Sequence, residues 1–433
     1  MGVWMSIINE MITEHNKRVI KSNTAIQNTM RKMITEYKDS DIAGFIDEWM
    51  AKEGSVKNYI ISGVDNDNQR EKAMFDLILH ANNIGIPVCL LHEGNSKIEG
   101  LLDNAITQVV SQNMQPNVVM INSSFPYYDP FFNRDAMDIS DMMKNVSTSN
   151  KLNSTSEKFL HGMIKYYTKV LNQKPYTYTM HSCNYKKLSS IVELNYQSGK
   201  ISEYLRDDII NLLSEGQDDI GTLASFFSEL MSKSKGVIDS SGVSKQLFNI
   251  TKAFKNNGII SIDIGSRTRR ILLDLIMQDL DNAVSMSKEC LVIIDKINVN
   301  SCNKLFEFID SLPNKCKLVI SSDDVYSMLN SNDQLFDTVM TRTEKAFMMR
   351  HGTDKSSRKM SESIGQYDHE DVVANYGGNK SSWRGEYTTS DSISIQKRKE
   401  FVVTPEEFRH LEDNEAYIRD TVKQELSHVK FRT

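Results

Sequence analysis

Short apolar runs typical of buried β-strands recur along the chain in two groups of three, and this pattern constrains the fold most strongly. Segments with apolar residues at helical spacing separate several of them, and alternation of strand and helix is typical of a parallel sheet covered by helices. The runs are NYIISG (58–63), IPVCLL (86–91), NVVMIN (117–122), GIISIDI (258–264), CLVIID (290–295) and CKLVISS (316–322). The sequence therefore predicts an α/β fold with a mostly parallel sheet.

The strand pattern disappears between about residues 150 and 250. Apolar residues recur there at helical spacing, in the segments 159–171, 201–213, 220–231 and 243–254. We therefore expect an all-α domain inserted into the sheet. The predicted organisation is a helical arm over 1–55, a first part of the α/β domain over 56–145, the all-α insert over 146–250, and a second part with C-terminal helices over 251–433.

Two expectations concern the ends of the chain. Residues 5–50 carry apolar positions at helical spacing, including Met33 and Ile34, and this spacing predicts the amphipathic helices of the arm. Near the other end, residues 404–407 place a threonine hydroxyl at an N-cap, a proline at the first helical position and a glutamate at the third. We expect a final pair of helices there, carrying Phe408, Leu411 and Tyr417.

The composition is that of a soluble globular protein, with 39% hydrophobic and 25% charged residues and a formal net charge of −6. No apolar run approaches the roughly 20 residues that cross a bilayer. The N-terminus lacks the pattern of a secretory signal, so we expect a cytoplasmic protein that reaches the inner face of a membrane only through partners. Cys89 and Cys290 lie in apolar runs and are predicted to be buried thiols, and no histidine spacing indicates a metal site.

The turn after the first apolar run lies where phosphate-binding ATPases place the loop GxxxxGK followed by Ser or Thr. In that loop glycines let backbone amides surround phosphate, lysine reaches the outer oxygens, and the hydroxyl holds magnesium. Gly63 keeps the first glycine, whereas Asn68 replaces the second glycine, Gln69 the lysine and Arg70 the hydroxyl residue. Asp65 and Asp67 add negative charges where a triphosphate would lie, so we expect the turn to repel phosphate.

A second catalytic position is altered about 230 residues later. LVIID (291–295) resembles a Walker B strand, in which the terminal aspartate, here Asp295, positions magnesium. The next residue is normally a glutamate that polarises the attacking water, but here it is Lys296, which cannot act as a base at neutral pH. Two distant losses in one chain argue against a working ATPase. No cofactor is expected unless the divergent site still binds ATP and Mg²⁺.

The order of these elements resembles the motor domain of the conjugative coupling proteins of type IV secretion systems, the TraG/TraD-like branch of the hexameric RecA-fold ATPases. The resemblance runs from about Tyr59 to the end of the chain. It rests on NYIISG, VCLLHEGN, INSSFPYYDPFFNRDAMDIS, GIISIDI, LVIIDKINV and KLVISSDDVYSMLN, and on SESIGQ and VVTPEEFRHLEDNEAYI, which look like the family's closing strand and helix motifs. It implies a RecA-like P-loop NTPase fold. The family's catalytic roles carry over only to Gly63 and Asp295, because Ser321 and Ser322 stand where the family has a sensor glutamine.

Two basic segments are candidate contact sites. Arg267, Arg269 and Arg270 follow the run GIISIDI and open a helix. They could bind DNA phosphate or a neighbouring subunit's nucleotide, or form a solvated helix start. The run Lys397-Arg398-Lys399 follows the polar stretch 376–392, which we expect to be a surface loop bearing Trp383. This run could hold single-stranded nucleic acid or be solvated.

Three functions are compatible with these observations. The leading interpretation is a catalytically degenerate, coupling-protein-like subunit, a pseudo-ATPase that acts as a scaffold or recruits substrate. The resemblance implies an oligomer or a mixed ring with related subunits, contacts with secretion-system or relaxase proteins, and DNA as a further partner. The first alternative is an active translocating ATPase in which Lys72 or Arg70 replaces the missing lysine. The second is a RecA-like scaffold in another mobile-element or defence system, with residues 150–250 as its partner-binding face.

Overall fold

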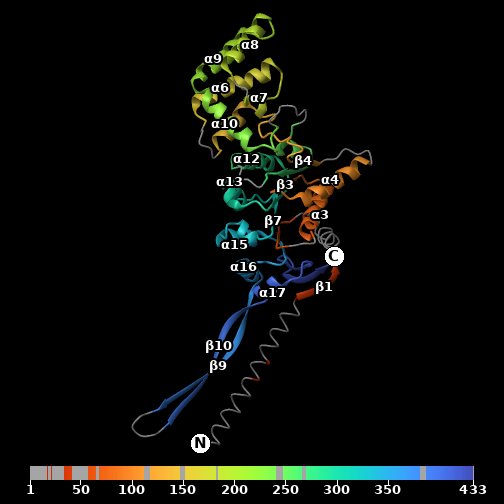
Figure 1. The fold of residues 1–433 in the computed structure, drawn as a ribbon, viewed down its shortest axis with the longest axis vertical. Coiled ribbons are helices and arrows are strands. Elements are labelled where there is room, and N and C mark those ends of the chain that lie inside the picture. Colours follow the sequence, from red (N-terminus) through yellow and green to blue (C-terminus); the bar gives the residue numbers. More distant parts are fainter. Residues whose placement is uncertain are drawn as a thin grey trace. The chain divides into compact units, whose positions relative to one another are not determined.

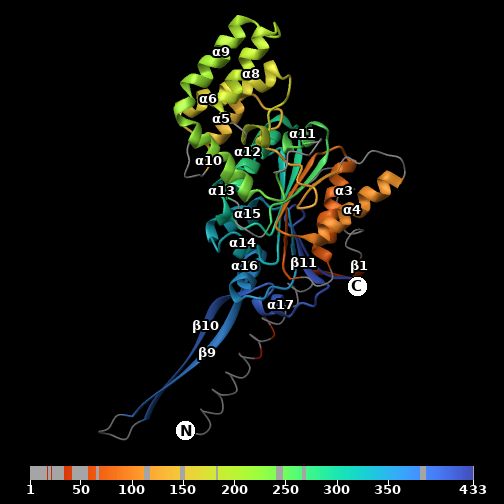
Figure 2. The ribbon, with the colours of Figure 1, turned by 45° about the horizontal axis from the view of Figure 1, so that its top comes forward.

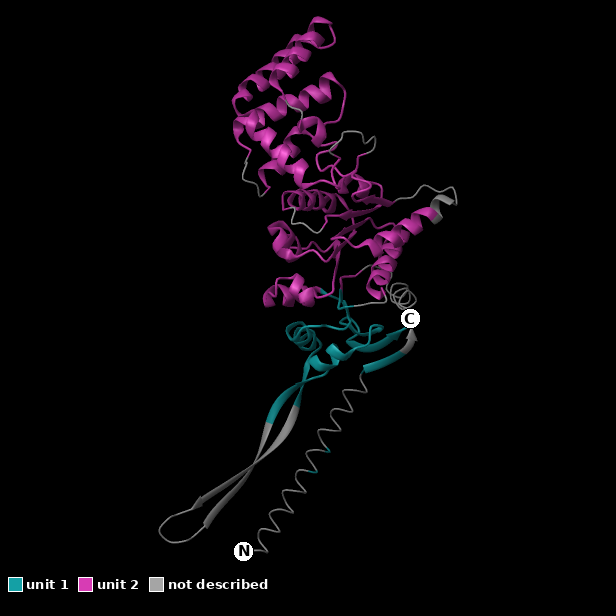
Figure 3. Cartoon of the chain, in the orientation of Figure 1, with its two compact units in different colours: residues 1–41, 61–67, 343–433 teal, residues 42–60, 68–342 magenta. Residues whose placement is uncertain are grey.

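The computed structural model describes residues 17, 21, 34–40, 57–64, 68–111, 118–146, 152–181, 184–239, 247–265, 270–380 and 387–432. The chain divides into two compact units (Figure 3). Unit 1 comprises residues 1–41, 61–67 and 343–433, and unit 2 comprises residues 42–60 and 68–342. Strand β2 (Tyr59–Ser62) contributes its first half to unit 2 and its second half to unit 1.

Unit 2 is built around a parallel sheet. Its strand order is β2-β7-β6-β3-β5-β4, with β7 at Cys316–Ser322, β6 at Cys290–Asp295, β3 at Val88–His92, β5 at Ile259–Asp263 and β4 at Val118–Ile121. The pairings of β7 with β6, β6 with β3, β3 with β5 and β5 with β4 are all parallel. Every apolar run singled out in the sequence forms one of these strands. The predicted α/β class is confirmed.

Helices pack against this sheet (Figure 2). Helix α3 (Gln69–Asn83) contacts β3 and β6, α4 (Ser96–Ser111) contacts β4, and α11 (Ile250–Lys255) contacts β5. Helix α12 (Arg270–Met286) packs on α11 and on α13 (Asn303–Asp310), and α14 (Val325–Met328) and α15 (Asp333–Arg342) follow β7. Covered faces explain why β3 and β6 are buried along their whole length.

The predicted helical insert lies between β4 and β5 (Figure 1, yellow to green). Helix α5 (Ala136–Lys144) precedes the predicted bounds 146–250, and the helices within them are α6 (Ser154–Lys165), α7 (Thr177–His181), α8 (Tyr185–Gln197), α9 (Glu203–Glu215) and α10 (Ile220–Lys233), with a π-helical turn at Tyr166–Val170. Buried Asp279 of α12 joins the segments that flank the insert. It accepts hydrogen bonds from the Ile250 amide (2.7 Å) and the Tyr128 hydroxyl (3.0 Å), and it pairs with Arg134.

Unit 1 contains strands that pair in antiparallel fashion, with one parallel pair at the edge of the sheet. Its strand order is β1-β12-β11-β8-β2, with β1 at Ile34–Ser40, β12 at Glu425–Phe431, β11 at Glu415–Asp420 and β8 at Lys345–Met348. Strand β1 is parallel to β12, and β11 is antiparallel to both of its neighbours. Helices α16 (Asp354–Ile364) and α17 (Pro405–His410) complete the unit, together with a two-stranded hairpin of β9 (Gln366–Lys380) and β10 (Tyr387–Phe401).

The structure corrects the predicted helical arm where it describes this segment. Residues 34–40 form strand β1 and not a helix, because they pair with the edge of the sheet at β12. Ile34, Thr35 and Tyr37 favour strand once such an edge is available. Residues 17 and 21 are helical, and the other residues of the arm lie outside the described residues.

Three further expectations near the C-terminus are wrong. The predicted helix pair is one short helix, α17, because Tyr417 lies in β11, where antiparallel pairing with β8 and β12 outweighs local helical spacing. SESIGQ is not a strand: α16 continues to Ile364, and Gly365, at φ 124°, ends it. The expected surface loop at 376–392 is mostly hairpin, since 376–380 pair with 387–391 and Ser392 with Asn375, while 381–386 lie outside the described residues.

Three further predictions concern membrane-spanning helices, cysteine thiols and metal sites. No helix in the described part of the chain is both long and apolar enough to cross a membrane. Cys89 and Cys290 are buried free thiols, as predicted, and so are Cys302 and Cys316, whereas Cys183 lies outside the described residues. Within the described ranges no group of three or more His, Cys, Asp or Glu residues could hold a metal ion.

Candidate functional site

The carboxyl ends of β3, β6 and β7 in unit 2 carry a cluster of buried polar residues. Asp295 is the last residue of β6, and Ser321 of β7 lies opposite it in register. Asn95 follows β3, and Arg70 and Glu71 lie in the first turn of α3. In open parallel sheets this edge is where ligands bind, so the fold places the sequence-predicted catalytic positions where an active site would be expected.

The Arg70 side chain lies at the centre of this cluster and is 4% exposed. Its guanidinium contacts Glu71 at 3.0 Å, Asp323 at 2.8 Å and Asp295 at 3.9 Å. Burial alone would lower the pKa of Arg70, but attraction to Asp295, Glu71 and Asp323 outweighs it, so the pKa is raised. Arg70 is therefore a permanent cation held among three carboxylates.

Asp295 is fully buried and receives one hydrogen bond from the described residues. Its Oδ2 accepts from Asn95 Nδ2 at 2.7 Å, and the same amide group lies 3.2 Å from Glu71. Its Oδ1 has no hydrogen-bond partner among the described residues, and it lies 3.9 Å from the Arg70 guanidinium. A guanidinium thus faces the carboxylate that the sequence predicts as the Walker B aspartate. The buried Ser321 hydroxyl also has no hydrogen-bond partner within the described ranges.

Other residues of the predicted nucleotide site are placed as follows. Asn68 takes a left-handed conformation (φ 61°) before α3, and Gln69 is buried. Lys296 is half-exposed and pairs with Asp323 at 3.1 Å. Gly63 belongs to unit 1, where a Cβ would lie 2.7 Å from Met349, so only glycine fits at its φ of 129°. Asp65 and Asp67 lie outside the described residues.

The sequence reasoning missed Glu71, Asn95 and Asp323. A signal was available for Asn95 and Asp323, because Asp323 directly follows one apolar run and Asn95 lies in the turn after another, and the carboxyl ends of both runs had to meet the end of LVIID in a parallel sheet. Glu71 carried no comparable signal, since an acidic residue in the first turn of a helix is common. Its role becomes visible only through the contacts of Arg70 and Asn95.

A buried histidine borders the cluster. Nδ1 of His92 accepts a hydrogen bond from the Asn95 amide at 3.2 Å, which assigns the ring proton to Nε2. Nε2 faces the Ser261 hydroxyl at 3.2 Å and Glu99 at 3.8 Å. Burial lowers the pKa of His92 despite the attraction of Asp263, Glu99 and Asp295. His92 therefore stays neutral near physiological pH and holds the turn after β3.

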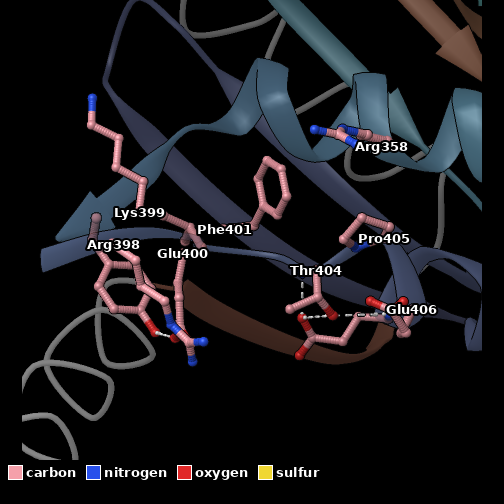
Figure 4. A pocket seen from close by; sticks show the side chains of 11 residues that line it. Arg358, Arg398, Lys399, Glu400, Phe401, Thr404, Pro405 and Glu406 are labelled. Atoms are coloured by element: carbon pink, nitrogen blue, oxygen red, sulfur yellow. Dashed lines mark hydrogen bonds and ion pairs between the residues drawn. The ribbon is translucent and has the colours of Figure 1, made fainter. Parts of the chain in front are cut away.

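The basic segments are not gathered at this cluster. Arg270 begins α12, and Arg267 and Arg269 lie outside the described residues. Arg398 and Lys399 line a different hollow, of about 680 Å³, in unit 1, together with Arg358, Phe401 and residues of α17 (Figure 4). Carboxylates balance these cations: Glu400 accepts from Tyr367 and Arg398, and Glu406 and Glu407 also line the hollow.

The strand order and the helices between β4 and β5 define an α/β protein whose mostly parallel sheet is flanked by helices. At positions 68–70 and 296 the chain has Asn, Gln, Arg and Lys where the P-loop and Walker B patterns have other residues. The predicted α/β class is confirmed, and Arg70 and Asp295 lie at the edge of the sheet where open parallel sheets bind ligands.

No protein-family model matches the chain, and no curated protein matches it. Similar solved structures include the plasmid coupling protein TrwB in complex with a non-hydrolysable ATP analogue, with a TM-score of 0.49 and 14% identity over 93% of this chain and 91% of that chain. An unbound form of the bacterial conjugative coupling protein TrwBdeltaN70 gives 0.46 and 13% over 87% and 85%. VirB4 of Thermoanaerobacter pseudethanolicus gives 0.41 and 9% over 87% and 89%. The first two of these structures are coupling proteins, the family that the sequence resembles.

Proposed function

We propose that this chain is a catalytically degenerate, coupling-protein-like subunit that acts as a scaffold or recruits substrate in type IV secretion or conjugative DNA transfer. The observation that carries the proposal is the enclosure of the Arg70 guanidinium by Asp295, Glu71 and Asp323. The chain would thus have the fold of a motor domain, with the Arg70 guanidinium and its carboxylate partners occupying the nucleotide position.

The donor set does not fit Mg²⁺. The position of the magnesium-binding hydroxyl is taken by Arg70, and the Asp295 carboxylate already faces that cation. Two unit charges about 4 Å apart interact by about 4 kcal/mol at an effective dielectric of about 20, so a divalent cation beside the guanidinium would meet strong repulsion. The free carboxylate and the hydroxyl that would position Mg²⁺ against a triphosphate are therefore missing together.

A divergent but active ATPase is not supported by the residues that it would need. Arg70 is committed to three carboxylates. The Lys72 side chain is exposed on α3, and its backbone amide donates to Asn68 as part of the helix. Lys296, which replaces the glutamate after the Walker B aspartate, pairs with Asp323. We therefore propose no reaction for this chain.

The proposal includes assembly with other proteins. A subunit of this kind would act in an oligomer or in a mixed ring with related ATPase subunits, at the inner face of a membrane through those partners. It would contact relaxase or secretion-system proteins and DNA. These expectations follow from the resemblance of the sequence to the coupling-protein family.

Affinity capture tests the assembly. The tagged full-length chain is expressed in its source cell, cross-linked, and purified, and the retained proteins are identified by mass spectrometry. We expect relaxase or secretion-system proteins, and we expect Lys72→Ala to retain the same set. Recovery of proteins from a defence system alone, with no secretion component, would contradict the proposal and favour a scaffold of another kind.

A further inference from the structure

A hollow of about 480 Å³ opens at the amino-terminal edge of the sheet in unit 2. Its lining comes from the residues just before β3, β5 and β6, from α11, and from the end of α12. The Arg70 cluster lies at the carboxyl ends of these same parallel strands. The hollow is therefore at the opposite edge of the sheet, and the function proposed above makes no use of it.

The hollow has an apolar floor and an apolar rim. Ile86, Phe254 and Ala283 line it and are buried, at 8%, 4% and 1% exposure. Met286 also lines it and is 56% exposed, so its side chain is available for contact. An apolar side chain of a partner that enters this hollow leaves water. Its burial favours binding by about 25 cal/mol per Å² of apolar surface removed from water.

Two lysines that form no ion pair within the described ranges line this hollow. Lys255 and Lys288 line it directly, and Lys252 lies three residues before Lys255 on the same helix. Lys252 Nζ lies 5.3 Å from the centre of the Phe132 ring, and Lys174 Nζ lies 5.8 Å from the same centre. Burial lowers the pKa of Lys252, and repulsion from Lys174 lowers it further.

Some lysines of the helical insert form ion pairs. Lys158 and Lys165, for example, each pair with a carboxylate, at 2.6 Å and 2.7 Å. No ion pair within the described ranges involves Lys174, Lys252, Lys255 or Lys288. Among the residues that line the hollow, Glu289 is the acidic one. The region thus carries positive charge that its described carboxylates do not balance.

We propose that this lysine-rimmed hollow binds an acidic peptide segment of a partner protein. One apolar side chain of the segment would occupy the floor, and Asp or Glu residues on either side would pair with Lys255 and Lys288. Charge complementarity selects the acidic partner, and the apolar floor selects a peptide over a phosphate chain. Single-stranded nucleic acid would bind through exposed aromatic faces as well as charge, but Phe254 is buried, and the Lys252 ammonium group lies over the rings of Phe132 and Phe248.

Fluorescence anisotropy with the full-length chain tests the proposal. The probes are fluorescein-labelled 12-residue peptides of alternating Glu and Asp, with Leu, Phe or Gly at one central position. We expect saturable binding of the Leu and Phe peptides and at least tenfold weaker binding of the Gly peptide. Binding should also weaken strongly between 0.05 and 0.5 M salt, as expected for charge pairing at a surface, where the Debye length falls to a few Å.

Charge reversal locates the site. Lys255→Glu and Lys288→Glu should each weaken binding of the Leu peptide by about tenfold. Each substitution removes a peripheral charge pair and adds repulsion between like charges. Met286→Ala should weaken binding of the Leu peptide and leave binding of the Gly peptide unchanged. Because Met286 is exposed, this substitution removes no buried side chain. Lys187→Glu, at an exposed position on α8, is the matched control and should bind as wild type does. Thermal unfolding of each variant excludes loss of fold.

Three results would overturn the proposal. These are no saturable binding of any peptide at 1 mM, equal binding of the Gly and Leu peptides, and equal weakening by Lys187→Glu. Tighter binding of a 12-nucleotide single-stranded DNA probe, lost in the same variants, would assign the surface to nucleic acid instead. None of these outcomes depends on nucleotide binding at Arg70, so the two proposals can fail separately.

Discussion

Arg70 is a single residue whose charge determines the chemistry of the candidate site. A serine or threonine at this helix position would leave Asp295 free to bind Mg²⁺, whereas the guanidinium occupies three carboxylates at once. Removing one partner of a buried charge network leaves the others unpaired in a poorly solvated environment. The same residue that closes the site is therefore expected to stabilise the fold around it.

Substitution of Arg70 should expose this dual role. Arg70→Met should lower the free energy of unfolding by about 3–5 kcal/mol at pH 7, because Asp295 and Glu71 lose their buried cation. Urea denaturation measures the change. Arg358→Met, at a side chain that is 69% exposed, is the control and should alter stability by less than about 0.5 kcal/mol. An Arg70→Met variant as stable as wild type would contradict the account.

Asp129 gives the stability of the insert a defined pH dependence. Burial raises its pKa to about 6 from an ordinary value of 3.8, although amide groups such as that of Thr177 oppose the shift. The folded state thus binds the proton more tightly, so this contribution to stability is full below about pH 4 and is lost as the pH rises through 6. A shift of about two pKa units corresponds to about 3 kcal/mol.

Comparison of pH profiles tests this expectation. The free energy of unfolding is measured from pH 4 to pH 7.5 for wild type and Asp129→Asn. Between pH 4 and 6.5 the free energy of unfolding of wild type should fall relative to that of the variant. Above that range the two pH profiles should be parallel. Parallel profiles over the whole range would show that Asp129 titrates normally.

At the scale of elements, the strand runs of unit 2 were predictable, and the elements of unit 1 were less so. Runs such as CLVIID are continuously apolar because both faces of a parallel sheet are covered, and that pattern is visible in one sequence. Strand β1 and strand β11 depend instead on pairing with distant partners, β12 and β8, which local periodicity cannot reveal. The Arg70 contacts were equally hidden, because they join α3 to the ends of β6 and β7.

The start of helix α17 was predictable because its cap is local. The Thr404 hydroxyl accepts from the Glu407 amide at 3.2 Å, and the Glu407 carboxylate accepts from the Thr404 amide at 2.7 Å. Thr404→Ala should lower the free energy of unfolding by about 1 kcal/mol. Thr404→Ser retains the hydroxyl and should remain near wild type in the same denaturation experiment. Equal losses in both variants would assign the effect to packing.

Asp279 is expected to hold the flanks of the insert to the sheet. It gathers Ile250, Tyr128 and Arg134 around one buried carboxylate. Asp279→Ala should lower the free energy of unfolding by about 3–5 kcal/mol, because Arg134 loses its buried partner. Asp103→Ala, at an exposed position on α4, is the control. Similar stabilities of the two variants, measured by urea denaturation, would refute this role.

At the scale of the whole molecule, the two edges of the unit 2 sheet carry different chemistry. The carboxyl edge holds a cation enclosed by acids, and the amino edge holds an apolar hollow lined by two lysines that form no ion pair within the described ranges. Under the two proposals, the first arrangement would oppose binding of Mg²⁺ and a nucleotide, and the second would favour an acidic partner. A subunit that recruits proteins within an assembly, without hydrolysing ATP, would combine both properties.

Isothermal titration of the full-length chain with MgATP tests the central claim most directly. The enclosed guanidinium and the missing P-loop lysine predict no saturable heat up to 1 mM MgATP, and no release of phosphate from the same mixture. Asp295→Ala should then leave both results unchanged. Micromolar binding of MgATP, with phosphate release that Asp295→Ala abolishes, would contradict the account and establish an active ATPase.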